Sequence, residues 1–127
     1  MPLINLIPRN TGMEDFLTYN IVEIRRTLKE VVSETWHRPQ HDIVVNAFRC
    51  PYLGNIDETT ADCIISVVTN PNPDLEASAD TLREEIANLP IFRELDMVEV
   101  SIQFTVHSWC LMEKGEIVDQ VDYNKGE

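Results

Sequence analysis

The chain has 127 residues, a formal net charge of −12 and 43% hydrophobic residues, which is enough apolar material for one domain with an ordinary core. The acidic balance argues against DNA or RNA as a partner, because a phosphate backbone would be repelled and no Lys/Arg cluster offers a local exception. No stretch approaches the roughly 20 apolar residues that cross a bilayer, and no signal-peptide pattern is present. With three widely spaced cysteines, we expect a soluble cytoplasmic protein.

The first half of the chain predicts a strand, a helix and a second strand. Leu3 to Ile7 is a short apolar strand, and Pro39 ends the helix that follows because its ring excludes the helical conformation for the preceding residue. Ile43 to Phe48 is β-branched and aromatic, which is typical of a strand. The helix is predicted by apolar residues at helical spacing, namely Met13, Phe16, Leu17, Ile21, Ile24, Leu28, Val31 and Val32.

After a connecting loop over 51–61, the same order repeats. Cys63 to Thr69 is a nearly continuous apolar strand, and Asn72 is the expected N-cap of a second helix. Met97 to Val106 alternates apolar and polar residues and predicts the last long strand. Val118 to Glu127 is polar and acidic, as in a short strand or a tail. The second helix buries a stripe formed by Leu75, Ala79, Leu82 and Ile86.

This element order predicts one α/β (α+β) domain over residues 1–127. Two βαβ units, 2–50 and 62–107, form a four-stranded mixed sheet with two helices on one face, and a C-terminal segment covers 108–127. The polar face of the last strand indicates that the other side of the sheet is wet or meets a partner. A ferredoxin-like domain has the same order, but its second and third strands form a hairpin with a short turn, whereas this loop is longer than hairpin loops.

Four stretches carry a family resemblance: MPLINL, DIVVNAFR, IISVVTNPNPDL and VSIQFTVHSWCLMEKGE. With them the chain resembles the tautomerase superfamily, which includes macrophage migration inhibitory factor, malonate semialdehyde decarboxylase and the 3-chloroacrylic acid dehalogenases. The resemblance covers most of the chain as a pattern, and its sharpest marker is the initial Met-Pro. It implies a tautomerase-like fold in which three sheets surround a central channel, hence a homotrimer, with the site at subunit interfaces and no cofactor or metal.

The resemblance implies that Pro2, once Met1 is removed, is the catalytic general base or acid. An ordinary α-amino group titrates at about 7.7–8.0. A dry setting or a nearby cation lowers that pKa, and a base works best when its pKa lies near the working pH. The alternative is that Pro2 only starts an edge strand, where a missing N–H costs nothing.

Arg9 and Arg49 are the expected substrate-binding cations. Arg9 follows the first strand and Arg49 ends the second, and relatives keep cations at both places. A guanidinium there would hold a substrate carboxylate bidentately and lower the pKa of the proline. The alternatives are an exposed loop arginine at position 9 and a surface salt bridge at position 49.

Two further binding residues are implied after the last strand, in LMEKGE and the segment before it. Glu113 matches a glutamate that activates water in the cis-type dehalogenases, and its alternative is a solvated surface residue. Trp109 could wall an apolar pocket in the same segment, with Tyr52 as a further candidate, and its alternative is a core or interface position.

One departure from the family pattern narrows the expected reaction. The decarboxylase and cis-dehalogenase branches carry two arginines in the loop after the third strand, where this chain reads Thr69-Asn70-Pro71-Asn72 with no cation. This argues against dehalogenation and decarboxylation. The prediction is therefore a cofactor-independent tautomerase or isomerase acting on a small enolisable 2-oxo acid. The alternatives are a non-catalytic trimeric binding or scaffold protein and a ferredoxin-like small-molecule-binding domain.

Overall fold

The computed structural model describes residues 1–53 and 61–123. Most of the predicted loop 51–61, and the end of the predicted C-terminal segment, lie outside the described residues. Within the described ranges, no helix is both long enough and apolar enough to cross a membrane.

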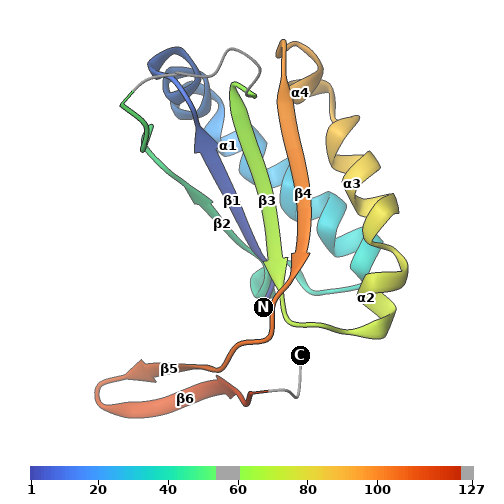
Figure 1. Ribbon diagram of the computed structural model, residues 1–127. Helices are drawn as coiled ribbons and strands as arrows, with labels where there is room; N and C mark the ends of the chain where they lie inside the picture. Colours follow the sequence, from blue (N-terminus) through green and yellow to red (C-terminus); the bar gives the residue numbers. More distant parts are fainter. Residues whose placement is uncertain (54–60, 124–127) are drawn as a thin grey trace.

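A four-stranded mixed sheet forms the centre of the molecule, in the order β2-β1-β3-β4 (Figure 1). β1 pairs in parallel with β2 and antiparallel with β3, and β3 pairs in parallel with β4. The four strands are β1 (Leu3–Pro8), β2 (Val44–Ala47), β3 (Cys63–Thr69) and β4 (Val98–Phe104). Since β1 lies between β2 and β3, these two strands form no hairpin with each other, and the topology differs from the ferredoxin-like alternative.

The predicted first helix is α1 (Thr11–Trp36), which returns the chain along one face of the sheet. It begins where the Asn10 side chain accepts a hydrogen bond from the backbone N–H of Met13 at 2.8 Å. It ends at His37, whose left-handed backbone precedes Pro39. A single 3₁₀ turn (Gln40–Asp42) then leads into β2.

The second crossover is more divided than the sequence predicts. Asn72 caps its first helix as expected, because the side chain accepts hydrogen bonds from the backbone N–H groups of Asp74 and Leu75. The predicted single helix is interrupted at Ser78, whose backbone is not helical. The three short helices are α2 (Pro73–Ala77), α3 (Ala79–Ala87) and α4 (Pro90–Arg93).

The core lies between the sheet and the helices. Both α1 and α3 contribute buried residues at helical spacing, and alternate residues of the central strands β1 and β3 meet them. The side chains that are wholly buried include Ile4, Leu6, Ile24, Leu28, Ile43, Ile65, Leu82 and Ile86.

The opposite face of the sheet carries no helix in the described part of the chain (Figure 1). The strand register places Asn46, Asn5, Ser66 and Ser101 in one row across this face. Asn46 Nδ2 donates to Asn5 Oδ1 at 3.2 Å within that row. As predicted, β4 directs Val100, Ile102 and Phe104 toward the core and polar residues to this open face.

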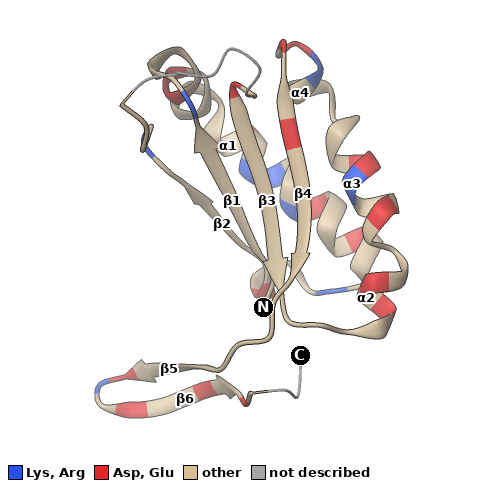
Figure 2. Ribbon diagram, in the orientation of Figure 1, with Lys and Arg blue, Asp and Glu red and all other residues tan. Residues whose placement is uncertain are grey.

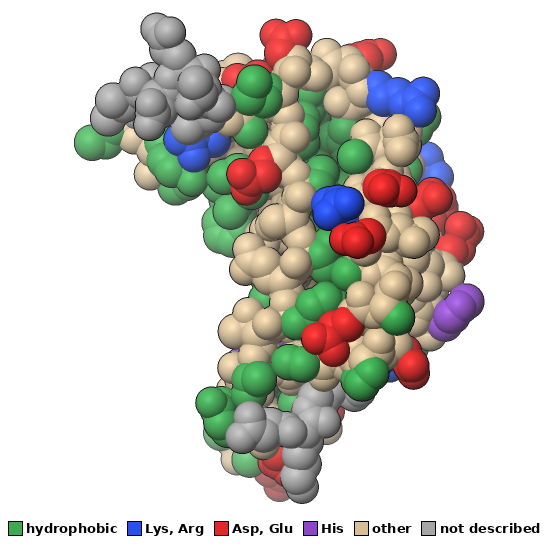
Figure 3. Space-filling view, turned by 45° about the vertical axis from the view of Figure 1, so that its right-hand side comes forward, with side chains coloured by type: hydrophobic (Ala, Val, Ile, Leu, Met, Phe, Trp, Pro, Cys, Tyr) green, Lys and Arg blue, Asp and Glu red, His purple; other side chains and the backbone are tan. Residues whose placement is uncertain are grey.

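A second sheet follows β4 that the sequence analysis missed. β5 (Trp109–Glu113) and β6 (Glu116–Val121) form an antiparallel hairpin that extends away from the main sheet (Figure 1). Its two-residue turn places Lys114 and Gly115 at positive φ, the geometry of a tight hairpin turn. Hydrophobic side chains are exposed on this projection (Figure 3), among them Leu111, Met112, Ile117 and Val118.

Candidate active site

Pro2 lies at the start of β1, in the interior of the sheet. It is buried, and its carbonyl accepts a hydrogen bond from the Val44 N–H at 3.0 Å. The alternative of an edge-strand proline is therefore wrong, since β1 has a neighbour on each side. The same end of the sheet holds the carboxyl ends of β3 and β4, because both run antiparallel to β1.

An apolar pocket of about 210 Å³ opens beside the start of β1. We call it the N-terminal pocket, and it is lined by Met1, Leu3, His107, Trp109, Cys110 and Leu111. The hairpin thus closes a cavity against the first residues of the chain, in the position predicted for Trp109. Apolar walls with a few polar groups are typical of small-molecule sites.

The environment of the N-terminus favours a neutral amine. In this structure the amine belongs to Met1, and burial is the main cause that lowers its pKa. The positive charge of Arg38 lowers the pKa further, whereas the carboxylates of Asp42 and Asp119 raise it. The cation near the chain start is thus Arg38, which the sequence analysis did not single out.

Three buried nitrogen donors lack a hydrogen-bond partner in the described part of the chain, namely Trp36 Nε1, Arg38 Nε and Asn70 Nδ2. All three lie at or just after the ends of elements: Trp36 is the last residue of α1, Arg38 follows it, and Asn70 comes directly after β3. A buried donor without a partner costs about 1–3 kcal/mol. An unpaired buried donor in a native structure calls for an explanation, and a ligand with acceptor oxygens is one.

The orientation of the Asn70 amide is fixed by its neighbour across the strand ends. Its Oδ1 accepts a hydrogen bond from the His107 backbone N–H at 3.1 Å, so the Nδ2 group points away from that donor. The His107 ring is held as well, since Nδ1 lies 2.7 Å from the Thr105 carbonyl oxygen. Nδ1 therefore donates to that carbonyl, and Nε2 is the nitrogen that can face a ligand.

Arg9 and Arg49 lie at the opposite end of the sheet from Pro2. Seven residues of extended chain separate Pro2 from Arg9, about 23 Å at roughly 3.3 Å per residue. The Arg9 guanidinium stacks over the Tyr52 ring, 4.2 Å from its centroid. Tyr52 therefore lies with Arg9 and not in the N-terminal pocket.

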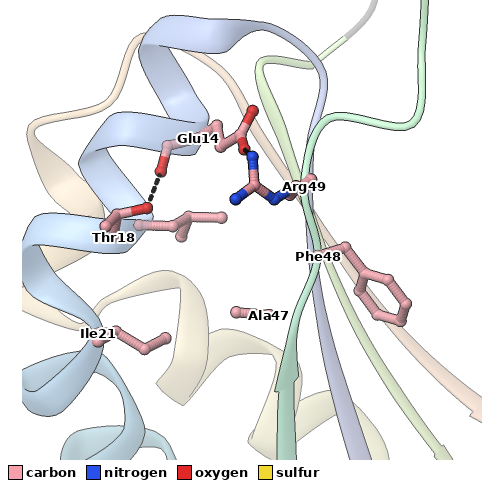
Figure 4. Close-up of a pocket in the computed structure, with 7 residues that line it drawn as sticks. Glu14, Thr18, Ile21, Ala47, Phe48 and Arg49 are labelled. Atoms are coloured by element: carbon pink, nitrogen blue, oxygen red, sulfur yellow. Dashed lines mark hydrogen bonds and ion pairs between the residues drawn. The ribbon is translucent and has the colours of Figure 1, made fainter.

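Arg49 forms an ion pair with Glu14, with 3.7 Å between Nη1 and Oε1. Figure 4 shows the two side chains pointing toward one another between α1 and β2. The same Glu14 carboxylate accepts a hydrogen bond from the Cys50 N–H at 3.4 Å. A second cavity of about 260 Å³ lies here, and its lining includes Leu17, Ile21 and Phe48. The surface salt bridge considered for Arg49 is thus present.

Glu113 lies at the far end of β5, four residues beyond Trp109. It pairs in register with Glu116 across the hairpin turn, and both side chains are exposed. Figure 2 shows acidic positions on both strands of the hairpin. Within a single chain, Trp109 therefore lies near the first residues, whereas Arg9, Arg49 and Glu113 lie away from the N-terminal pocket.

Sequence reasoning did not assign His107 to the N-terminal pocket, nor did it place Arg38 near the chain start or Asn70 beside His107. The available signal was topological: in a βαβ unit the crossover returns the chain to the starting end of the first strand, so residues just before β2 must lie near Pro2. Asn70 occupies the loop where the family pattern has arginines, a place already noted for its lack of a cation. In the described ranges, no group of three His, Cys, Asp or Glu side chains could hold a metal ion.

The fold is similar to that of several solved structures, although no protein-family model and no curated protein matches the sequence. A domain of unknown function from Sebaldella termitidis matches with a TM-score of 0.55 at 11% identity, over 92% of this chain and 99% of that one. A macrophage migration inhibitory factor-like protein from Entamoeba histolytica matches with a TM-score of 0.54 at 14% identity, over 87% and 93%. A fused 4-OT protein, solved as an asymmetric trimer, matches with a TM-score of 0.53 at 12% identity, over 91% and 94%.

Proposed function

The chain has the tautomerase fold, and we propose that it is a cofactor-independent tautomerase or isomerase acting on a small 2-oxo acid. The observation that carries the proposal is the position of Pro2, buried just ahead of the paired residues of β1 and beside an apolar pocket, in surroundings that lower the pKa of the Met1 amine. Proline is tolerated just ahead of a strand for structural reasons, so the argument depends on the burial of Pro2 and on the pocket beside it.

In the proposed mechanism, removal of Met1 frees the Pro2 nitrogen as a secondary amine. The neutral amine takes a proton from the carbon next to the substrate carbonyl, and the resulting ammonium returns it to oxygen or to another carbon. Pro2 lies one residue deeper in the fold than Met1, so burial acts on its amine too and favours the neutral base.

The Arg38 guanidinium supplies the cation that the reaction needs. Its charge reaches the N-terminal amine, and it can hold the substrate carboxylate and stabilise the enolate that forms on proton removal. Trp109 provides an apolar wall for the rest of the substrate.

Arg9, Arg49 and Glu113 can contribute to this pocket only from another copy of the chain. We propose a homotrimer, as in the fused 4-OT structure, which is a trimer. Two surfaces support association: the sheet face without a helix, and the hairpin, whose exposed apolar side chains need cover because isolated two-stranded hairpins are marginally stable. We also propose that the protein is cytoplasmic, because its three cysteines are free and free thiols are typical of a reducing compartment.

The test is the enol–keto conversion of phenylpyruvate by the wild-type protein and by P2A. We expect catalysis that falls by about 10²–10⁴-fold in P2A, the usual contribution of a positioned base. If wild-type protein lacking Met1 shows no activity on phenylpyruvate and related 2-oxo acids, or if P2A keeps full activity, the proposal is wrong. The first result would favour the non-catalytic binding protein.

A further inference from the structure

We propose that Asn70 Nδ2 is the hydrogen-bond donor to the keto oxygen of the substrate. This inference rests on the proposed function, because it assigns a further catalytic residue to the same site. The carrying observation is a side-chain amide that is 1% exposed and whose nitrogen has no partner among the described residues.

The position of Asn70 places this donor at the chain start. β1 and β3 are antiparallel, with Leu3 opposite Val68, so the register continued by two residues sets Asn70 opposite Met1. Asn70 also bonds the backbone of His107, which lines the N-terminal pocket. Removal of Met1, which the proposed function already requires, takes away the residue that faces Asn70.

The rest of the side chain is committed to holding that donor in place. Because Oδ1 accepts from the His107 N–H, rotation of the amide would set two N–H groups against each other. The Nδ2 group is thus oriented before a ligand arrives. A preorganised donor in a site that excludes water is the arrangement that stabilises a developing enolate oxygen.

The test compares N70D with the matched control N72D in the full-length protein. Asp at position 70 keeps an oxygen for the His107 N–H but loses the donor, so the fold is expected to survive. Asp at position 72 introduces the same charge two residues away, where it remains a good N-cap for α2. Thermal unfolding of both variants checks the fold.

The binding of two unreactive ligands measures the contribution of the keto oxygen to affinity. Benzoylformate carries the 2-oxo acid group but has no hydrogen to enolise, and phenylacetate has a methylene in place of the keto group. We expect wild-type and N72D proteins to bind benzoylformate up to about tenfold more tightly than phenylacetate. In N70D this preference is lost, and kcat for phenylpyruvate falls by about 10²–10³-fold.

The outcomes separate this inference from the proposed function. If the keto preference is lost in N70D while the wild-type protein has no Pro2-dependent activity, the donor role stands and the tautomerase proposal fails. If P2A abolishes activity but N70D keeps wild-type kcat and keto preference, Asn70 is not the donor. Absence of any keto preference in the wild-type protein would also overturn the inference.

Discussion

The two ends of the main sheet treat their polar groups in opposite ways. At the end with Arg9 and Arg49, the cations have partners: Tyr52 lies under one guanidinium and Glu14 faces the other. At the end with Pro2, Trp36 Nε1, Arg38 Nε and Asn70 Nδ2 are buried without a partner in the described residues.

We interpret the paired arginines as structural and the unpaired buried nitrogens as donors that a ligand can use. The ion pair joins an exposed Arg49 side chain, just after β2, to a partly buried Glu14 side chain in α1. The donors near Pro2 carry an unfavourable desolvation that folding alone does not repay. We therefore locate function at the Pro2 end, although the sequence offers more arginines at the other.

The largest effect should follow from blocking the Pro2 nitrogen. A short extension fused ahead of Met1, which cannot be removed, keeps this nitrogen an amide without basicity. We expect the activity on phenylpyruvate to fall to the level of P2A, with little change in the thermal unfolding midpoint. An extended protein that remained as active as the native chain would move catalysis away from this end of the sheet.

The two arginine positions provide the next comparison. R38Q removes the cation close to the amine, and we expect kcat/KM for 2-oxo acids to fall about 10–100-fold, the value of a charge-assisted hydrogen bond. R49Q is the matched control at the opposite end, and because Arg49 pairs with Glu14 of its own chain, we expect little change in kcat/KM. A large loss in R49Q would show that Arg49 contributes to the pocket of another copy in the proposed trimer.

The pH dependence of kcat/KM tests whether the pKa of the catalytic amine is lowered. Burial and Arg38 lower the pKa of the Met1 amine, and we expect the same surroundings to lower the pKa of the Pro2 amine once Met1 is removed. We expect the acidic limb of kcat/KM to lie below pH 8 and to move upward in R38Q, because a positive charge is removed. An acidic limb that does not move in R38Q would contradict the role of that charge.

The same lowered pKa has a consequence for stability. The unfolded chain binds a proton to this amine more readily than the folded chain does, so stability should rise with pH between the folded pKa and about 8. Blocking the amine by acetylation should remove this part of the pH dependence, as measured by urea unfolding. An unchanged slope after acetylation would show that other groups cause it.

The smallest effect belongs to the ion pair at the far end. E14Q breaks the pair with Arg49 but keeps an oxygen for the Cys50 N–H. Since exposed pairs contribute little, we expect a loss below about 1 kcal/mol in the free energy of unfolding and no change in kcat/KM. Urea unfolding and the phenylpyruvate assay together check this, and a marked loss of activity would make the far end part of the site.

Much of the fold could be predicted because local signals agree with it. The apolar stripe of α1, the Asn72 cap and the alternation of β4 each specify their element. The hairpin was missed because its turn is Lys114-Gly115, a weaker signal than Asn-Gly or Asp-Gly, and because its strands lack clean alternation.

From the sequence, only the part of the site that the N-terminal motif marks could be predicted. Pro2 and the nearby Trp109 could be proposed from motifs, whereas Asn70 depends on a hydrogen bond to His107, 37 residues away in sequence. Whether a donor is left without a partner is a property of the packed strand ends, and no local pattern encodes it. Similarly, Arg38 reaches the amine because α1 brings the chain back to the start of β1.

The most direct test of the central claim is the intact mass of untagged protein purified from its own host. We expect the mass to be lower than that of the full sequence by one methionine, because removal of Met1 leaves Pro2 with a free secondary amine. A mass that includes Met1 would contradict the account, because the Pro2 nitrogen would then be an amide and could not act as a base.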